Sequence, residues 1–201
     1  RTVVVLSNGS PVSLPWVAKP SAIVEANLGG QASGEAVDDV LFGEREPGGR
    51  LAETFPAAQV DIASDLWFPG DPHQVEYREG LFVGYRHHVT TGAEPLFPFG
   101  HGLSYTTFSW REPEVDRETL SAGDAMTITV DVTNTGDRAG SDVVQVYVHD
   151  RSGVVLRPRR ELGGFAKVHL EAGASETVSI ELGPRAFAFY DVEREEWAIP
   201  S

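Results

Sequence analysis

Cysteine is absent from the 201 residues, and positive charge is scarce. Without cysteine the chain can hold neither disulfides, thiolate nucleophiles nor cysteine metal sites, although both a secreted and a cytoplasmic location stay open. Only Lys19 and Lys167 are lysines, and 16 basic residues face 30 acidic ones, for a net charge of −14. This acidity argues against nucleic acid or an anionic membrane as a partner and suits a neutral ligand.

Long apolar runs are missing too. No segment approaches the roughly 20 apolar residues that a membrane-spanning helix needs, and no signal peptide opens the chain. The apolar fraction of 41% and the charged fraction of 23% are those of an ordinary globular protein. The length allows one large domain or two small ones.

The first part of the chain predicts α/β structure. Val3–Leu6 is a continuous apolar run, as expected of a strand buried on both faces of a parallel sheet. Residues 12–17 form a short crossover to a second strand at Ala22–Ala26, right-handed by default. Apolar residues at helical spacing predict a helix over 32–42 that ends at Gly43.

Two loops follow the predicted parallel strands, Ser7–Gly9 and Asn27–Gly30. Open α/β sheets bind ligands at such carboxyl ends. The second loop precedes a helix, so its amides could hold an anion. The glycine pattern matches neither a dinucleotide fingerprint nor a phosphate loop, so a tight turn without a ligand is the favoured interpretation.

The middle of the chain is irregular but apolar. Residues 56–71 predict a long connecting loop, docked through Trp67 and Phe68. Tyr77, Phe82 and Tyr85 could stack on a sugar ring, although packing in a core or a domain interface is favoured. Pro95–Phe108 combines prolines and glycines, which prevent a regular helix, with many large apolar side chains. We expect this segment to be a strap pressed into a groove between two packed bodies.

The last part predicts an all-β sandwich. Residues 126–133 alternate apolar and polar side chains without interruption, which is typical of a half-buried antiparallel strand. Asn134–Asp137 is its turn. Further strands are expected at 144–148, 162–170, 177–182 and 187–190, separated by turn residues at the spacing of a β-sandwich. Residues 196–201 lead toward a last strand that we expect to be missing.

Several segments, in this order, resemble glycoside hydrolase family 3. Leu96–Phe108 is similar to the segment that leads from the family's α/β sandwich domain into its fibronectin type III-like domain. Further similar segments are Gly29–Ala36, Leu41–Gly43, Pro47–Leu51, Tyr77–Arg86 and Arg157–Phe165. The resemblance runs from about Val3 to about Tyr190. It implies the end of an α/β sandwich domain over 1–94, an interdomain strap over 95–108, and a fibronectin type III-like β-sandwich over 109–201.

The resemblance also implies a function. The chain would be the C-terminal part of an exo-acting, retaining β-glucosidase that uses no cofactor, and its partners would be the upstream barrel and sandwich portion and a β-glucoside. A β-xylosidase or another exo-glycosidase of the family is the near alternative, and a homo-oligomer is compatible with the sequence. Because residues 1–94 contain too few strands for an α/β sheet, we expect the chain to be a piece of a larger enzyme, nicked or made separately.

No catalytic, cofactor-binding or metal-binding residue is assigned. Glycoside hydrolysis needs two positioned carboxyl groups, and the family places them on segments absent here. Glu25, Glu35 and Asp38 would be the first candidates if the chain alone were active; Glu35 is expected to favour the helix dipole and Asp38 and Asp39 to be solvated.

The other site types receive little support. Six histidines lack metal-ligand spacing, and adjacent His87 and His88 point to opposite sides if extended (His73, His87, His88, His101, His149 and His169). Ser7 and Ser104 lack a serine-hydrolase elbow. For His101 the sequence favours two interpretations equally: a residue that makes a polar contact across the domain junction, or an exposed turn residue.

Two functions from other classes remain open. A non-catalytic module that binds a polysaccharide or a protein would use exposed aromatic side chains, with Trp110 and Trp197 as first candidates. A purely structural adhesion-type domain would leave the βαβ segment and the strap unexplained.

Overall fold

Two compact units make up the chain in the computed structural model, which describes residues 1–121 and 123–200. The first unit comprises Arg1–Gly102 and the second Leu103–Ser201. The boundary falls inside the predicted strap. That the strap fills a groove between two bodies stays a prediction.

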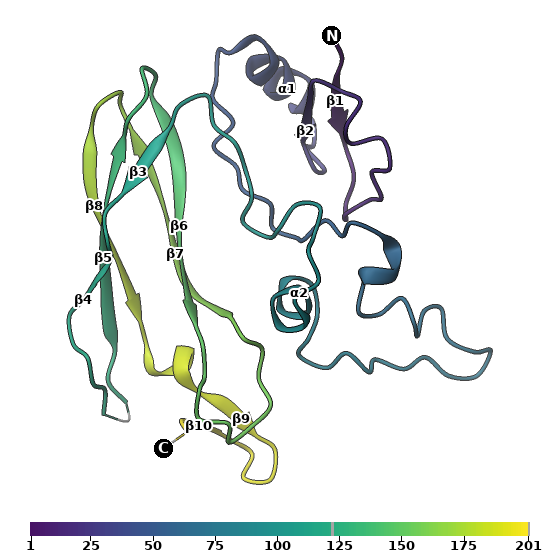
Figure 1. Ribbon diagram of the computed structural model, residues 1–201, viewed down its shortest axis with the longest axis vertical. Helices are drawn as coiled ribbons and strands as arrows, with labels where there is room; N and C mark the ends of the chain where they lie inside the picture. The colour runs from purple at the N-terminus through teal and green to yellow at the C-terminus, as the bar shows by residue number, and fades with distance from the viewer. Residues whose placement is uncertain (122, 201) are drawn as a thin grey trace. The chain divides into compact units, whose positions relative to one another are not determined.

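The first unit begins with the predicted parallel pair. Strands β1 (Val3–Leu6) and β2 (Ala22–Glu25) pair in parallel with Val3 opposite Ala22, and the crossover between them is built of turns (Figure 1). The prediction that β1 is buried on both faces is wrong, because Val3 and Val5 are 46% and 38% exposed. In the described part of the chain β1 and β2 pair only with each other, so no further strand flanks them in their sheet.

The predicted helix is confirmed. Helix α1 spans Ser33–Phe42 and ends at Gly43, whose φ of 80° is left-handed and suits glycine. A short 3₁₀ turn, η1 (Gln59–Asp61), follows after an extended segment.

Helix α2 (Tyr85–Thr91) was not predicted. It lies between Gly84 and Gly92, both with positive φ. The idea that neighbouring histidines point to opposite sides of an extended segment is therefore wrong. On the helix His88 is buried, and its Nδ1 lies 3.0 Å from the carbonyl oxygen of Ala93.

The long loop between η1 and α2 runs out from the first unit and returns (Figure 1). The predicted docking through Phe68 is wrong, and the predicted docking through Trp67 stays a prediction. Trp67 is half-buried, whereas Phe68 is 77% exposed.

The first part of the strap is paired with residues 51–55. Leu51 donates its amide to the carbonyl of His101 (2.8 Å), and Phe55 does the same to Phe97 (2.8 Å). Gly102 passes so close that an added Cβ would lie 2.5 Å from the carbonyl oxygen of Gly49. The backbone of the first part of the strap is thus hydrogen-bonded to an extended neighbouring segment, although the strap contains prolines.

The second unit is a β-sandwich (Figure 1). In one sheet, β5 pairs with β3 and β4 and, on its other side, with β8; in the other, β6 pairs with β7. The bounds are β3 (Phe108–Trp110), β4 (Glu114–Val115), β5 (Met126–Asn134), β6 (Gly140–Val148), β7 (Glu161–Leu170) and β8 (Ser175–Leu182).

After β8 come η2 (Pro184–Phe187) and a hairpin of β9 (Phe189–Asp191) and β10 (Glu196–Ala198). The segment expected to approach a last strand therefore forms a strand paired with β9. That one further strand closes the sandwich stays a prediction.

Alternating side chains of four strands build the core of this unit. The perfect alternation predicted for 126–133 appears as alternating burial along β5, where Val132 is fully enclosed. The buried cluster consists of Ile128, Val130, Val132, Val144, Val168, Leu170, Val178, Ile180 and Leu182. Burying each such side chain stabilises the fold by about 1.5–3 kcal/mol, so this unit has a core of its own.

Asn134 ties the ends of these strands together. Its buried amide receives the hydroxyl of Thr106 (2.6 Å) and the backbone amide of Gly136 (3.0 Å) at Oδ1. Its Nδ2 donates to the carbonyl oxygens of Arg138 (2.7 Å) and Leu170 (2.9 Å). The predicted turn residue is thus a fully hydrogen-bonded core residue.

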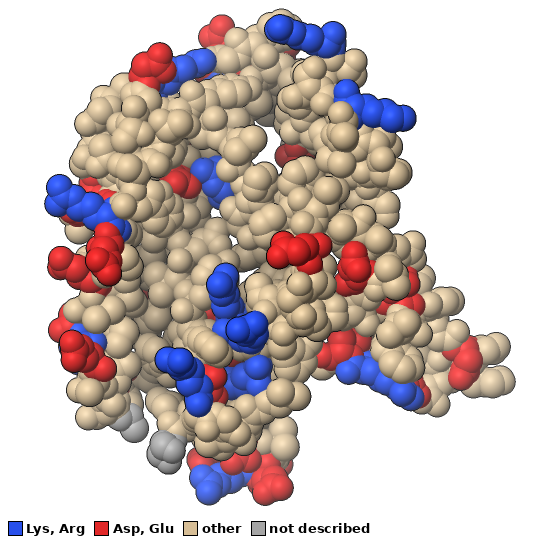
Figure 2. Space-filling view, viewed as in Figure 1, with Lys and Arg blue, Asp and Glu red and all other residues tan. Residues whose placement is uncertain are grey.

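Charged side chains of both signs are interspersed over the face in Figure 2. Among the described residues no helix is long and apolar enough to cross a membrane.

Candidate functional site

The carboxyl ends of β1 and β2 hold a polar cluster. The parallel pairing brings the two predicted ligand loops to one edge, where the hydroxyl of Ser7 donates to the carbonyl of Asn27 (3.2 Å). Asn8 donates from Nδ2 to Glu25 Oε2 (3.2 Å) and to the carbonyl of Ser10 (2.7 Å). The loops therefore form one hydrogen-bonded edge.

Glu25 is the charged centre of this edge. Its Oε1 accepts the backbone amide of Asn27 (2.8 Å), while Asn8 occupies Oε2. Asn27 has a φ of 49°, a left-handed conformation that asparagine tolerates. Both oxygens of this carboxylate accept neutral N–H donors, so the structure uses Glu25 to hold the two loops together.

The glycine turn before α1 is tight. An added Cβ on Gly29 would lie 2.5 Å from Ser33 Oγ, and the amide of Ser33 donates to the carbonyl of Gly30 (3.3 Å). This geometry agrees with the favoured interpretation of a turn. Glu35 lies in the first turn of α1.

The neighbouring acidic residues follow the predicted pattern of a solvated helix face. Asp38 is exposed, and Asp39 forms an ion pair with Arg45 at 3.0 Å (Nε to Oδ2). Exposed pairs of this kind contribute little to stability.

The histidines are dispersed. His101 stacks on Phe97 (ring centroids 5.3 Å apart), and His169 Nδ1 lies 3.0 Å from the hydroxyl of Ser141. Burial, and secondarily the neighbouring His88, lowers the pKa of His87, against an opposing effect of Asp61. Across residues 1–121 and 123–200 no group of three or more histidine, aspartate or glutamate side chains could hold a metal ion.

Trp110 and Trp197 are each about half exposed, at 45% and 48%. Trp110 donates from Nε1 to Asp142 (3.2 Å). The Arg185 guanidinium lies 3.2 Å from a ring centroid of Trp197, and Tyr190 contacts the indole edge-on (5.4 Å). These rings belong to β3 and β10, which lie in different sheets.

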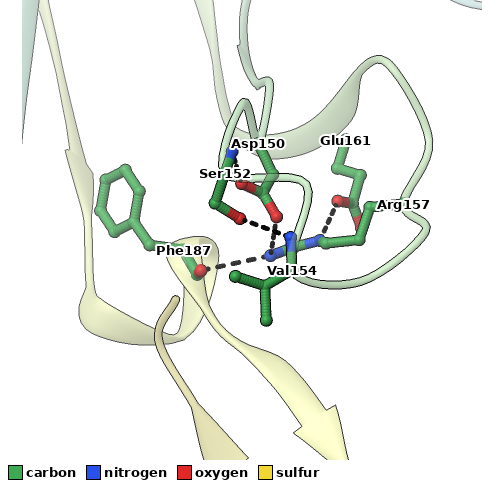
Figure 3. A network of polar contacts seen from close by, with 6 residues as sticks. All are labelled: Asp150, Ser152, Val154, Arg157, Glu161 and Phe187. Atoms are coloured by element: carbon green, nitrogen blue, oxygen red, sulfur yellow. Dashed lines mark hydrogen bonds and ion pairs between the residues drawn. The ribbon is translucent and has the colours of Figure 1, made fainter. Parts of the chain in front are cut away.

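A buried ion pair organises the loop between β6 and β7 (Figure 3). The Arg157 side chain, 7% exposed, donates from Nε to Glu161 (2.7 Å) and from an Nη to the carbonyl of Phe187 (3.2 Å), and the same Nη lies 4.0 Å from Asp150 Oδ2. Burial acts to raise the pKa of Asp150, but hydrogen bonds from Ser152 and the charge of Arg157 outweigh it, so the net pKa is lowered.

An adjoining cavity of about 460 Å³ is lined by Asp150 and Arg157 together with apolar side chains such as Val148, Phe187 and Ile199. Asp150 Oδ2 is buried without a hydrogen-bond partner among the described residues. The ion pair therefore fixes the shape of this loop.

Comparison with known proteins identifies both units. The profile of the glycosyl hydrolase family 3 C-terminal domain matches residues 1–105, and that of the fibronectin type III-like domain matches residues 142–201. The fold thus defines the C-terminal region of a glycoside hydrolase. The chain belongs to glycoside hydrolase family 3.

Individual relatives agree with this assignment. Thermostable beta-glucosidase B of Acetivibrio thermocellus is 51% identical over 199 residues, covering 99% of this chain and 26% of that protein. Exo-alpha-(1->6)-L-arabinopyranosidase of Bifidobacterium longum is 42% identical, covering 99% and 26%. The crystal structure of DesR, a beta-glucosidase from Streptomyces venezuelae, in complex with D-glucose matches with a TM-score of 0.91 at 38% identity, covering 100% and 26%.

The chain therefore spans about a quarter of the length of the curated relatives it matches. The predicted family and the predicted fold, an α/β portion followed by a fibronectin type III-like β-sandwich, are confirmed.

Proposed function

We propose that the chain is the C-terminal part of an exo-acting, retaining β-glucosidase that releases terminal non-reducing β-D-glucosyl residues without a cofactor. The observation that carries this proposal is the 51% identity, over 199 residues, to a beta-glucosidase. The likeness covers 99% of the chain, so it includes both units rather than one shared module.

In this proposal the chain braces the active site and carries no catalytic carboxylate. A retaining mechanism needs a nucleophile and an acid/base about 5 Å apart, each free to react. The acidic residues weighed from the sequence do not match this need: Glu25 has both oxygens hydrogen-bonded, and Asp38 is a solvated residue of α1. Their surroundings support catalytic carboxylates elsewhere in the enzyme.

The partner in this proposal is the upstream barrel and sandwich portion of the same enzyme, in one polypeptide or as a cleaved chain. Support comes from the first unit. Among its described residues, Leu14 and Phe55 are the only buried members of the hydrophobic core, each with 4% of its surface exposed. Many others stay exposed, including Val3, Leu28 and Phe42. A unit with so little core gains stability from a covering partner.

The test is hydrolysis of an aryl β-glucoside by the chain alone and by the chain mixed with the upstream portion. We expect activity only in the mixture. Activity of the chain alone would overturn the assignment and return attention to Glu25, Glu35 and Asp38. No activity in either sample, with both parts shown to bind each other, would contradict the β-glucosidase proposal.

A different sugar specificity is the near alternative, because one relative is named an arabinopyranosidase at 42% identity. A panel of aryl glycosides given to the complete enzyme separates these functions. Hydrolysis of the α-L-arabinopyranoside or the β-xyloside in preference to the β-glucoside would replace glucose as the proposed sugar.

A binding module is the second candidate, favoured by the half-exposed rings of Trp110 and Trp197. Sedimentation of the chain with insoluble cellulose, with and without Trp110→Ala and Trp197→Ala, tests this function. It is supported only if both substitutions reduce the bound fraction.

A further inference from the structure

Exposed aromatic side chains lie on the loop between η1 and α2. We name residues 64–78 the aromatic loop. Phe68 is 77% exposed and Tyr77 83%, the latter among the most exposed large apolar side chains described. Single exposed apolar residues are ordinary, so these exposures alone do not define a site, and the pocket beside Phe68 is needed to identify one.

The aromatic loop is internally braced. Asp71 Oδ1 accepts the backbone amides of His73 (2.7 Å) and Gln74 (2.9 Å), and the amide of Asp71 donates to the carbonyl of Gln74 (3.0 Å). Gly70 has a φ of 89°, and an added Cβ there would lie 2.6 Å from the Gln74 carbonyl oxygen. The turn that presents Phe68 is therefore a defined structure that needs glycine.

A second set of contacts orders the polar side of the loop. The Arg78 guanidinium lies 4.2 Å from the ring centroid of Trp67 and forms an ion pair with Glu76. Gln74 donates from Nε2 to the other oxygen of Glu76 (2.8 Å). These side chains hold one another in place, so little conformational entropy remains to be lost when a ligand binds.

A pocket of about 310 Å³ opens in this loop. Its lining combines two aromatic side chains with four planar polar ones: Trp67, Phe68, Asp71, Gln74, Glu76 and Arg78. The volume is at the lower end of the range for small-molecule pockets.

This lining suits a neutral sugar. Ring faces pack against the C–H surface of a pyranose, while carboxylate, amide and guanidinium groups can hydrogen-bond to its hydroxyls. Arg78 is neutralised by Glu76, and Asp71 adds negative charge, so an anionic ligand is disfavoured.

We infer that the aromatic loop is a binding site for a β-linked gluco-oligosaccharide, with Trp67 and Phe68 as its stacking platform. The choice of glucose rests on the proposed function; the existence of a sugar site rests on the lining of the pocket.

Isothermal titration of cellobiose and cellotetraose into the chain tests this inference. Trp67→Ala and Phe68→Ala should each weaken binding about five- to tenfold, as expected for loss of one stacking contact. Phe42→Ala is the matched control, because Phe42 is also 77% exposed but lies on α1, outside the loop. Equal affinity in all four proteins, or no binding by any of them, would overturn the inference.

The same variants in the complete enzyme separate this inference from the proposed function. They also replace the titration of the chain alone if the first unit needs the upstream portion to fold. We expect a raised KM for cellotetraose and an unchanged kcat/KM for an aryl β-glucoside. A complete enzyme that binds cellotetraose through the loop but cleaves no glucoside would refute only the proposed function.

Nitration footprinting of Tyr77 tests whether the loop is instead an interface between parts of the enzyme. If Tyr77 in the sugar-free complete enzyme is already protected from nitration, the loop is an interface between parts of the enzyme, and the sugar site is refuted. Protection that appears only with cellotetraose supports it.

Discussion

Replacing Asn134 by alanine is the most informative test of the second unit. The Asn134→Ala substitution removes an amide that is 0% exposed and makes four side-chain hydrogen bonds. It leaves the backbone bonds of this residue intact: the amide to Ala174 (2.9 Å) and the carbonyl from Gly173 (3.1 Å). The loss should therefore come from the side chain alone.

The size of the effect follows from the four bonds. A hydrogen bond contributes about 1 kcal/mol net, and a buried partner left unsatisfied costs about 1–3 kcal/mol. The hydroxyl of Thr106 and the carbonyl oxygen of Leu170 would both lose their Asn134 partner in the interior. We expect the free energy of unfolding of this unit to fall by about 3–5 kcal/mol, a large part of the stability of an ordinary domain.

Native-state amide hydrogen exchange is the suitable assay, because amides of β5 and β8 report on the second unit even if the two units unfold separately. Protection at Val130 and Val178 should fall by the full amount. Thr106→Val provides the control: alone it should cost about 1 kcal/mol, and together with Asn134→Ala less than the sum, because the two share a bond. A loss below about 1 kcal/mol for Asn134→Ala would refute the reasoning.

Three further predictions concern the same unit. Gly164→Ala places a Cβ 2.7 Å from Ile180 Cγ2, so the substitution should lower the free energy of unfolding by about 1–3 kcal/mol. The same hydrogen-exchange measurement tests this. Unchanged protection would show that the two strands can move apart to fit the methyl group at no cost in stability. Arg157→Met leaves the carboxylates of Asp150 and Glu161 buried without their cation, so the unfolding free energy measured in urea should fall by about 3–5 kcal/mol; an unaltered midpoint would contradict this role. Because the pKa of Asp150 is lowered in the fold, its contribution to stability is complete above the ordinary aspartate pKa of about 3.9 and is lost as the pH falls through the lower folded pKa. Asp150→Asn should therefore flatten the decline of unfolding free energy with acid in that range, and an unchanged acid profile would count against it.

Local patterns predicted the regular elements well. The period-two alternation over 126–133 corresponds to β5, and the apolar runs near residues 3 and 22 correspond to the parallel pair. Such patterns depend on a residue and its immediate neighbours, which the sequence displays directly. Helix α2 was not predicted because its seven residues include two histidines and two threonines, which are weak helix formers.

Contacts between distant residues could not be predicted in the same way. Asn134 occupies a typical turn sequence, but its partners Thr106 and Leu170 are 28 and 36 residues away. For the edge at Glu25, the sequence predicted that the two loops lie together, because parallel strands place the loops that follow them at one edge. It did not predict the hydrogen bond from Asn8 to Glu25, for which no sequence pattern exists. For the aromatic loop, Tyr77 could be singled out as an aromatic residue, but the bracing of Trp67 by Arg78 could not.

The two units differ in how they obtain their stability, and this difference bears on function. The second unit buries a continuous cluster drawn from four strands, which is the usual basis of an independently folding domain. The first unit has hydrogen-bonded strands and a strap, but Leu14 and Phe55 are the only buried members of the hydrophobic core in its described part. A unit that depends on a partner for its apolar cover assembles fully only when that partner is present. If so, the chain alone should unfold in two steps, with the first unit lost well before the second. A single sharp transition that covers both units would show instead that the first unit is stable by itself, and the need for an upstream partner would lose its physical basis.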